Sequence, residues 1–168
     1  LFVGMVAIDI QAQEFTKLWE RSARTGAEEG VPSWFASGMN RGIAEYNGKV
    51  YVSDRGNTAI HALDAATGAE LTLDTPFDLT GVAGGTFPLL DLNVSEDGAF
   101  FLGNLTTNAT TSPFRLYWWT SEGGTFTDSL TFNAEGRLGD KITVVGSLSD
   151  NTIEVWLAAG GSNPGVVY

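Results

Sequence analysis

One unit recurs three times along this chain: an alternating apolar strand, a tight turn, a second strand, a loop of small residues and a third strand. The turns are Asn47-Gly48, Asp97-Gly98 and Asp150-Asn151, and the second strands that follow them start at Lys49, Ala99 and Thr152. Successive second strands therefore start 50 and 53 residues apart. A repeat of about 40 to 50 residues that holds about four strands is typical of a β-propeller blade. The sequence predicts an all-β chain, a partial β-propeller of about two and a half to three four-stranded antiparallel blades from a larger closed propeller.

The repeat also sets the expected boundaries of the blades. We expect blades over residues 41–74, 89–132 and 141–168, with the third truncated in its third strand. The strand-like segment 15–21 (FTKLWER) has no hairpin partner nearby, and we expect it to complete the last blade of the closed propeller.

Two adjacent tryptophans constrain the second blade. Trp118 and Trp119 lie in one predicted strand, so their side chains must face opposite sides of the sheet. One is expected in the core, and the other is either exposed or stacked on a neighbouring blade.

The first residues bear on export. Residues 1–10 (LFVGMVAIDI) are mostly apolar but too short to span a bilayer as a helix, and the small residue Ala12 follows them. This pattern predicts that residues 1–12 are the tail of a signal peptide. We expect a protein exported to the periplasm, the cell surface or the extracellular space, with no transmembrane segment. An ordinary buried N-terminal strand is the alternative.

The net charge and the absence of cysteine limit the kinds of partner and chemistry that we expect for this chain. The chain has 20 acidic and 9 basic residues, a formal net charge of −11, so nucleic-acid phosphates would be repelled and we expect no such partner. There is no cysteine, and therefore no disulfide, thiolate ligand or cysteine nucleophile. A protein, a glycan or a small molecule of unknown identity is the expected ligand.

Catalytic patterns are scarce in this sequence. His61 is the only histidine, so an H-E-x-x-H zinc site cannot be built from these residues. It lies in the middle of a predicted strand, which favours a hydrogen-bonded structural role over a place in a catalytic triad. We expect no catalytic residues and no cofactor.

Three charged residues are candidates for a ligand site. Arg41 and Asp91 each lie eight residues before the start of a second strand, and Asp140 lies near the corresponding end of the third unit. Inner strands line the central channel of a propeller, so these side chains are predicted to gather at its mouth and bind a ligand there. The alternative is that they pair with each other or with connector backbone between blades.

Short motifs spread over nearly all of the chain after Gln13 carry a resemblance. They are residues 19–22 (WERS), 32–35 (PSWF), 41–44 (RGIA), 63–68 (LDAATG), 84–87 (GGTF), Asp91, Val94, Asp97-Gly98, 104–106 (NLT), 111–115 (TSPFR) and 137–141 (RLGDK). In these motifs the chain resembles a secreted bacterial family that is catalogued only as a domain of unknown function. The resemblance implies a propeller-like fold in an exported protein, often with a C-terminal sorting module, and it implies no activity. Residues 62–70 (ALDAATGAE) are also similar to repeats of quinoprotein dehydrogenases.

Two functions remain open at this point. The first is an exported, non-catalytic propeller that acts as a binding or surface-interaction module. The alternative is a propeller enzyme with its site at the channel mouth. It would be either a metal-dependent hydrolase or lactonase, with Asp91 and Asp140 as candidate ligands, or a quinone-dependent dehydrogenase.

Overall fold

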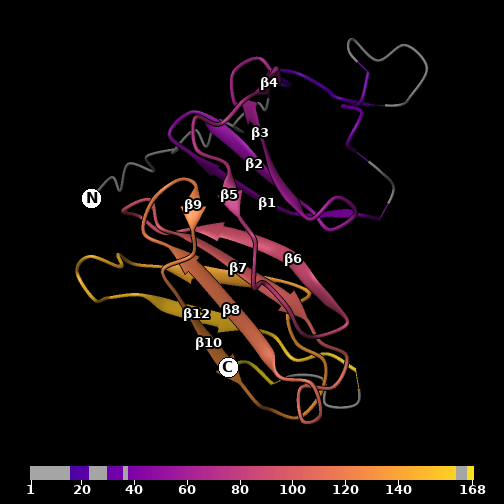
Figure 1. Cartoon of the computed structure of the whole chain (residues 1–168), viewed down its shortest axis with the longest axis vertical. Coiled ribbons are helices and arrows are strands. Elements are labelled where there is room, and N and C mark those ends of the chain that lie inside the picture. The colour runs from indigo at the N-terminus through magenta and orange to yellow at the C-terminus, as the bar shows by residue number, and fades with distance from the viewer. Residues whose placement is uncertain (1–15, 23–29, 36–37, 162–165) are drawn as a thin grey trace, which may run out of the picture.

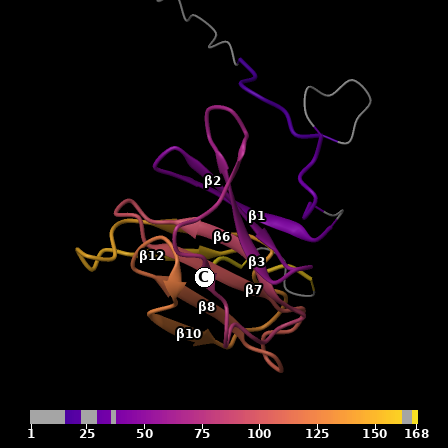
Figure 2. The same cartoon turned by 45° about the horizontal axis from the view of Figure 1, so that its top comes forward.

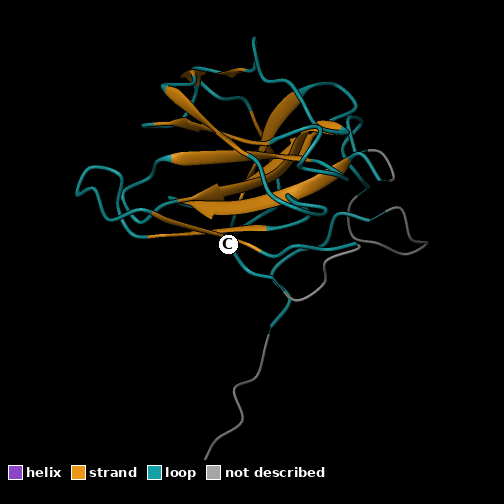
Figure 3. Ribbon diagram, turned by 90° about the horizontal axis from the view of Figure 1, so that it is seen from below, coloured by secondary structure: helices purple, strands orange, loops and turns teal. Residues whose placement is uncertain are grey.

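The fold consists of strands and loops (Figure 3). The computed structural model describes residues 16–22, 30–35, 38–161 and 166–168, so the predicted signal-peptide tail, residues 1–12, lies outside the described residues. Every regular element within the described residues is a β-strand, which confirms the predicted all-β class. Among these residues no helix has the length and apolar character needed to cross a membrane.

The first four strands form one antiparallel meander, here called blade 1. They are β1 (Asn40–Tyr46), β2 (Lys49–Asp54), β3 (Ala59–Asp64) and β4 (Glu70–Leu71), hydrogen-bonded in that order. Asn47 and Gly48 join β1 to β2 with φ angles of 50° and 75°. Both angles are positive, as the predicted two-residue hairpin requires.

Blade 2 is a second antiparallel meander. Its strands are β6 (Phe87–Val94), β7 (Phe100–Leu105), β8 (Phe114–Trp119) and β10 (Asp128–Phe132), in the order β10-β8-β7-β6. The fourth strand begins only at Asp128, and Phe126 before it packs edge-on against Tyr117 and Trp119, with ring centres 5.1 and 6.0 Å apart. The sequence also did not predict the short parallel pair of β5 (Phe77–Asp78) and β9 (Gly124–Thr125).

The third unit, here called blade 3, has two regular strands and one bridged segment. β11 (Ile142–Val145) pairs with β12 (Glu154–Leu157). Residues 166–168 then run beside the end of β12, where Leu157 and Tyr168 exchange backbone hydrogen bonds of 2.9 and 2.8 Å.

The three meanders stand side by side. Each begins with its inner strand, and β6 contacts β1 on one side and β11 on the other. Figures 1 and 2 show blade 1, in indigo to purple, beside blade 2, in magenta to orange. Successive antiparallel meanders arranged around a shared axis are the architecture of a β-propeller, as the repeat predicted.

Two apolar layers fill the spaces between blades. The layer between blades 1 and 2 is rich in aromatic rings and includes Tyr51, Phe77, Phe100, Tyr117 and Trp119. The layer between blades 2 and 3 includes Phe101, Phe114, Leu116, Ile142 and Leu157. Because successive residues of a strand face opposite sides, β7 and β8 supply side chains to both layers.

The tryptophan pair follows this alternation. Trp119 is 1% exposed in the layer facing blade 1. Trp118 packs against the layer facing blade 3, where its ring stacks near Phe101 at 6.3 Å. The prediction that one ring is core and the other faces a neighbouring blade is therefore confirmed.

Inner strands β1 and β6 approach one another closely at Gly42. The Ser53 hydroxyl accepts a hydrogen bond from the Gly42 amide at 2.8 Å and donates one to the Leu90 carbonyl at 2.6 Å. A Cβ atom at residue 42 would lie less than 3.0 Å from the backbone nitrogen of Leu92 and the oxygen of Leu90. Only glycine leaves room for this contact between the backbones of two blades.

We expect Gly42→Ala to lower the free energy of unfolding by about 1–3 kcal/mol, because the added methyl group overpacks the contact between β1 and β6. Urea unfolding followed by tryptophan fluorescence measures this. Gly30→Ala is the matched control, since no atom lies within 4 Å of the corresponding Cβ position there. Equal losses in the two variants would contradict the close approach.

Asp97 joins the first turn of blade 2 to blade 3. Its carboxylate accepts hydrogen bonds from the Ser95 hydroxyl at 2.6 Å, from the Ser149 amide at 2.8 Å and from the Leu148 amide at 3.1 Å. The Ser95 hydroxyl first, and then the backbone amides, hold the pKa of Asp97 well below its usual range. Because the pKa is lower in the folded chain, ionised Asp97 stabilises the fold at neutral pH, and this contribution is lost in acid.

We expect Asp97→Asn to be less stable than the wild type at pH 7, with a difference that shrinks as the pH falls below about 4. Unfolding free energies measured across this range test the expectation. A difference that stayed constant with pH would show that the carboxylate charge is not what links the two blades.

Candidate functional site

A polar pocket of about 400 Å³ lies at the starting ends of the inner strands. Antiparallel pairing places Asn40 opposite Asp54 and Phe87 opposite Leu105, so residues at the start of an inner strand meet residues at the end of the next strand. We call this cavity the arginine pocket. It is lined by Arg41, Arg55, Phe87, Leu90, Leu105, Arg137 and Asp140.

The segment that carries Arg137 and Asp140 is fixed by pairing on both sides. Arg137 exchanges backbone hydrogen bonds with Gly160 of blade 3, and Leu138 exchanges them with Thr106 beside blade 2. Gly139 has a φ of 89°, and any Cβ atom there would collide with the Asn104 carbonyl. The short connection into β11 is therefore held rigidly against blade 2.

One ion pair lies in this pocket. The Nε and Nη2 atoms of Arg137 donate to the two oxygens of Asp140, each at 2.5 Å. This fork lowers the pKa of Asp140, and the charge of Arg41 lowers it further. Asp140 therefore stays ionised at neutral pH and keeps Arg137 in a defined orientation.

Neither of the other two arginines forms an ion pair with a carboxylate of the residues that the structure describes. The Arg55 guanidinium lies 3.8 Å from the centre of the Phe87 ring, a cation–π contact, and its buried Nε has no hydrogen-bond partner among the described residues. Arg41 is exposed, and the described part of the chain offers its guanidinium no hydrogen bond or ion pair. Three guanidinium groups and one carboxylate leave the pocket with an excess of two positive charges, in a chain of net charge −11.

Asp91, the third predicted site residue, is not among the residues that line the pocket. It is 2% exposed, and its carboxylate accepts hydrogen bonds from the Ile142 amide at 2.6 Å and from the Lys141 ammonium at 3.1 Å. Burial raises the pKa of Asp91, and these two donors oppose the rise. Asp91 thus makes the pairing between blades that the sequence left open as an alternative.

The equal spacing of Arg41 and Asp91 from their second strands does not give equal positions. Register irregularities lie between Asn40 and Ile43 in β1 and between Phe87 and Asp91 in β6. A bulge adds a residue without advancing the pairing, so counting along the chain misplaces side chains beyond it. Arg41 lies inside the irregular stretch of β1 and lines the pocket, whereas Asp91 lies in the regular part of β6, paired with Gly103, and is buried in the contact between blades.

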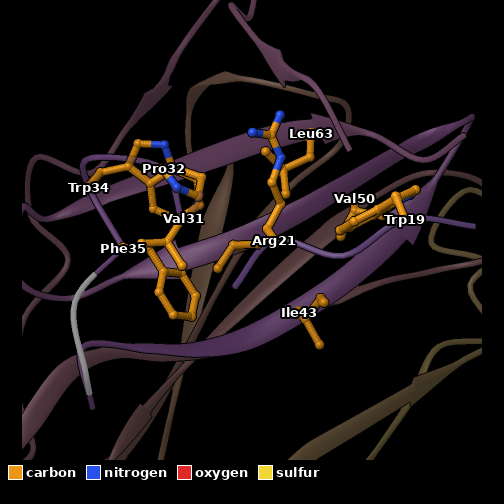
Figure 4. A pocket seen from close by; sticks show the side chains of 10 residues that line it. Trp19, Arg21, Val31, Pro32, Trp34, Phe35, Ile43, Val50 and Leu63 are labelled. Carbon is orange, nitrogen blue, oxygen red and sulfur yellow. The ribbon is translucent and has the colours of Figure 1, made fainter. Parts of the chain in front are cut away.

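A second, apolar pocket of about 150 Å³ lies on the face of blade 1 away from blade 2 (Figure 4). Residues of the N-terminal segment line it together with Ile43, Val50, Val52 and Leu63 of the sheet. The Trp19 indole donates to the Ala65 carbonyl at 2.8 Å, so segment 16–22 lies against blade 1. The segment thus lies on the face of blade 1 that points away from blade 2, and the expectation that it completes the last blade of a closed propeller stays a prediction.

His61 belongs to the same face of blade 1. Its ring stacks on Trp34 with centres 4.0 Å apart, and its Nε2 lies 3.2 Å from an Asp54 oxygen. Burial would raise the pKa of Asp54, but hydrogen bonds from Asn57 and His61 lower it overall. These contacts hold the N-terminal segment and the turn after β2 in place, which is the structural role that its position in a strand predicts.

Arg55 and Arg137 are the charged residues of the pocket that sequence reasoning missed. Arg137 belongs to the motif at residues 137–141, next to the selected Asp140. Arg55 directly follows the second strand of blade 1, at the end where the first strand begins. A search for charged residues at both ends of each predicted hairpin would have found Arg55.

We expect Asp91→Ala to lower the free energy of unfolding by about 1–3 kcal/mol, because it leaves the Ile142 amide buried without an acceptor. Asp140→Ala, which breaks an exposed ion pair, should cost less than about 1 kcal/mol. Chemical denaturation of both variants provides the comparison. A larger loss for Asp140→Ala would contradict the assignment of Asp91 to the contact between blades.

Comparisons with known proteins give a family and a distant structural likeness. No curated protein matches this chain. Among solved structures, it is similar to the PQQ-bound form of aldose sugar dehydrogenase from Streptomyces coelicolor, with 19% identity and a TM-score of 0.42. That match covers 74% of this chain and 38% of the dehydrogenase, so this chain spans less than half the length of that protein. The family described as a domain of unknown function, DUF4623, matches residues 12–139, and the chain belongs to this family.

Proposed function

We propose that this chain is an exported, non-catalytic β-propeller module that binds a ligand in the arginine pocket. The observation that carries the proposal is the convergence of Arg41, Arg55, Arg137 and Asp140 at the starting ends of the inner strands. Side chains from two blades and one connection meet there on rigidly paired backbone. Loops and strand ends held by a fixed scaffold are where folds of this kind carry their binding residues.

In this proposal, Asp91 does not line the pocket but stabilises the chain segment that carries two of its residues. Its hydrogen bonds to Ile142 and Lys141 hold the segment that follows Arg137 and Asp140. Asp91 is therefore a positioning residue, and Arg41 and Asp140 are the predicted site residues that face the ligand.

The larger closed propeller is also part of the proposal. Val145, Trp156 and Val167 are 42%, 49% and 62% exposed. Pairing of Thr143 with Trp156 and of Ala158 with Val167 places them on one face, opposite the layer that packs on blade 2. An apolar face of this kind is what a further blade would cover.

Among the residues that the structure describes, no specific observation favours the alternative that the chain is a propeller enzyme. The Asp91 carboxylate accepts hydrogen bonds from Ile142, Lys141 and Asn93, and the Asp140 carboxylate accepts two from the Arg137 guanidinium. Within the described residues, no three His, Asp or Glu side chains form a group that could hold a metal ion. A pocket lined by three arginines would in addition repel a cation.

A ligand screen tests the binding proposal. We expect at least one compound from a panel of small acids, glycans and peptides to raise the melting temperature of the protein, since a ligand that binds the folded state stabilises it. Arg137→Gln should abolish this shift.

Lys17→Gln is the control for this screen, because it removes one positive charge at an exposed position outside the pocket. A stabilising ligand that Arg137→Gln, Arg41→Gln and Arg55→Gln all leave unaffected would place the site elsewhere. Conversion of the ligand to a product would overturn the non-catalytic part of the proposal.

A further inference from the structure

We propose that the arginine pocket receives an anionic group, a carboxylate or a phosphate, at one end of a small organic ligand. This inference rests on the proposed binding function and adds the chemical class of the ligand. Of the six arginines in the chain, three line this single pocket, although the chain as a whole is strongly acidic. Gathering like charges costs free energy unless an opposite charge joins them.

The contacts that the Arg137 and Arg55 guanidinium groups already make indicate that an anion can bind to their remaining N–H groups. Arg137 uses two of its five donors on Asp140, so part of its planar edge remains available. Arg55 is held by stacking on Phe87, and its buried Nε has no acceptor. Stacking on an aromatic ring occupies the face of a guanidinium and leaves its N–H edge for a planar or tetrahedral anion.

Arg41 adds a third donor group from the start of β1, beside the end of β2 that carries Arg55. It is exposed and has no hydrogen-bond or ion-pair partner among the described residues, yet it is close enough to lower the pKa of Asp140. An incoming anion would therefore meet Arg41 at the opening and Arg55 further inside. Charge-assisted hydrogen bonds from guanidinium groups are the strongest that a pocket of this kind can supply.

The remaining lining and the size of the pocket argue for an organic anion. Phe87, Leu90 and Leu105 contribute apolar surface beside the arginines. The volume of about 400 Å³ exceeds what a single inorganic ion fills and lies in the range of pockets for small organic ligands. The ligand should therefore carry a compact uncharged portion next to its acidic group.

Titration calorimetry of the complete chain with three probes tests this inference. The probes are citrate, inorganic phosphate and the uncharged polyol sorbitol, all at one fixed ionic strength. We expect saturable binding of citrate, phosphate or both with a dissociation constant near or below about 1 mM, and none of sorbitol. Citrate alone would identify a carboxylic acid as the ligand class, and phosphate alone would identify a phosphate ester.

Variants assign the binding to the pocket. Arg41→Gln and Arg55→Gln should each weaken binding by about tenfold or more, because each removes a charge-assisted hydrogen bond. Lys17→Gln should leave the affinity unchanged although it removes the same charge. Arg41 is exposed, so its variant keeps the test valid even if Arg55→Gln disturbs the packing on Phe87.

Three outcomes would overturn the inference. They are no saturable binding of either anion, an equal loss in Lys17→Gln, and full binding in both arginine variants. If a neutral compound from the ligand screen depends on the pocket while both anions fail to bind, the proposed function stands and only the ligand class is wrong. If no compound of any kind depends on the pocket, both proposals fail.

Discussion

The close approach of neighbouring inner strands is the constraint on which the rest of the structure depends. Blades 1 and 2 meet where a glycine, Gly42, lets the backbone of β1 reach β6, and where the Ser53 hydroxyl bridges to Leu90. Blades 2 and 3 meet through the Asp91 carboxylate and the Ile142 amide. Both contacts are buried polar links beside the apolar layers, so they fix the position of each blade against the next in a way that apolar packing alone would not.

The arginine pocket is a consequence of this packing. Its side chains come from the end of β2, the start of β1 and the connection into β11, which are far apart in sequence. They meet because the inner strands start at the same end of the molecule and stand at fixed separations. The hydrogen bond between the buried Asp91 carboxylate and the Ile142 amide at the start of β11 holds the connection that carries Arg137 and Asp140. The buried Asp91 therefore fixes the position of the exposed Asp140.

Local patterns were enough to predict the architecture, and they were not enough to predict the site. Strand alternation, the turn at Asn47 and Gly48 and the repeat spacing depend on neighbours in sequence, and the blades follow them closely. The parallel pair of β5 and β9 and the place of Phe126 depend on contacts between distant segments, which no local pattern reports. Arg41 and Asp140 were selected because strand ends can be located from sequence, and both line the arginine pocket; that they bind a ligand stays a prediction. Asp91 was grouped with them because the irregularity in β1, which displaces Arg41, cannot be detected by counting residues.

Because the side chains of Trp118 and Trp119 alternate in β8, they limit which insertions and deletions this domain can accept during evolution. Each ring belongs to a different interface, so inserting or deleting one residue within β8 would send both rings to the wrong side of the sheet at once. A central blade built in this way can lengthen or shorten only in its turns. We therefore expect the number of residues in β8 to stay constant during evolution, while the lengths of the surrounding turns and loops can vary.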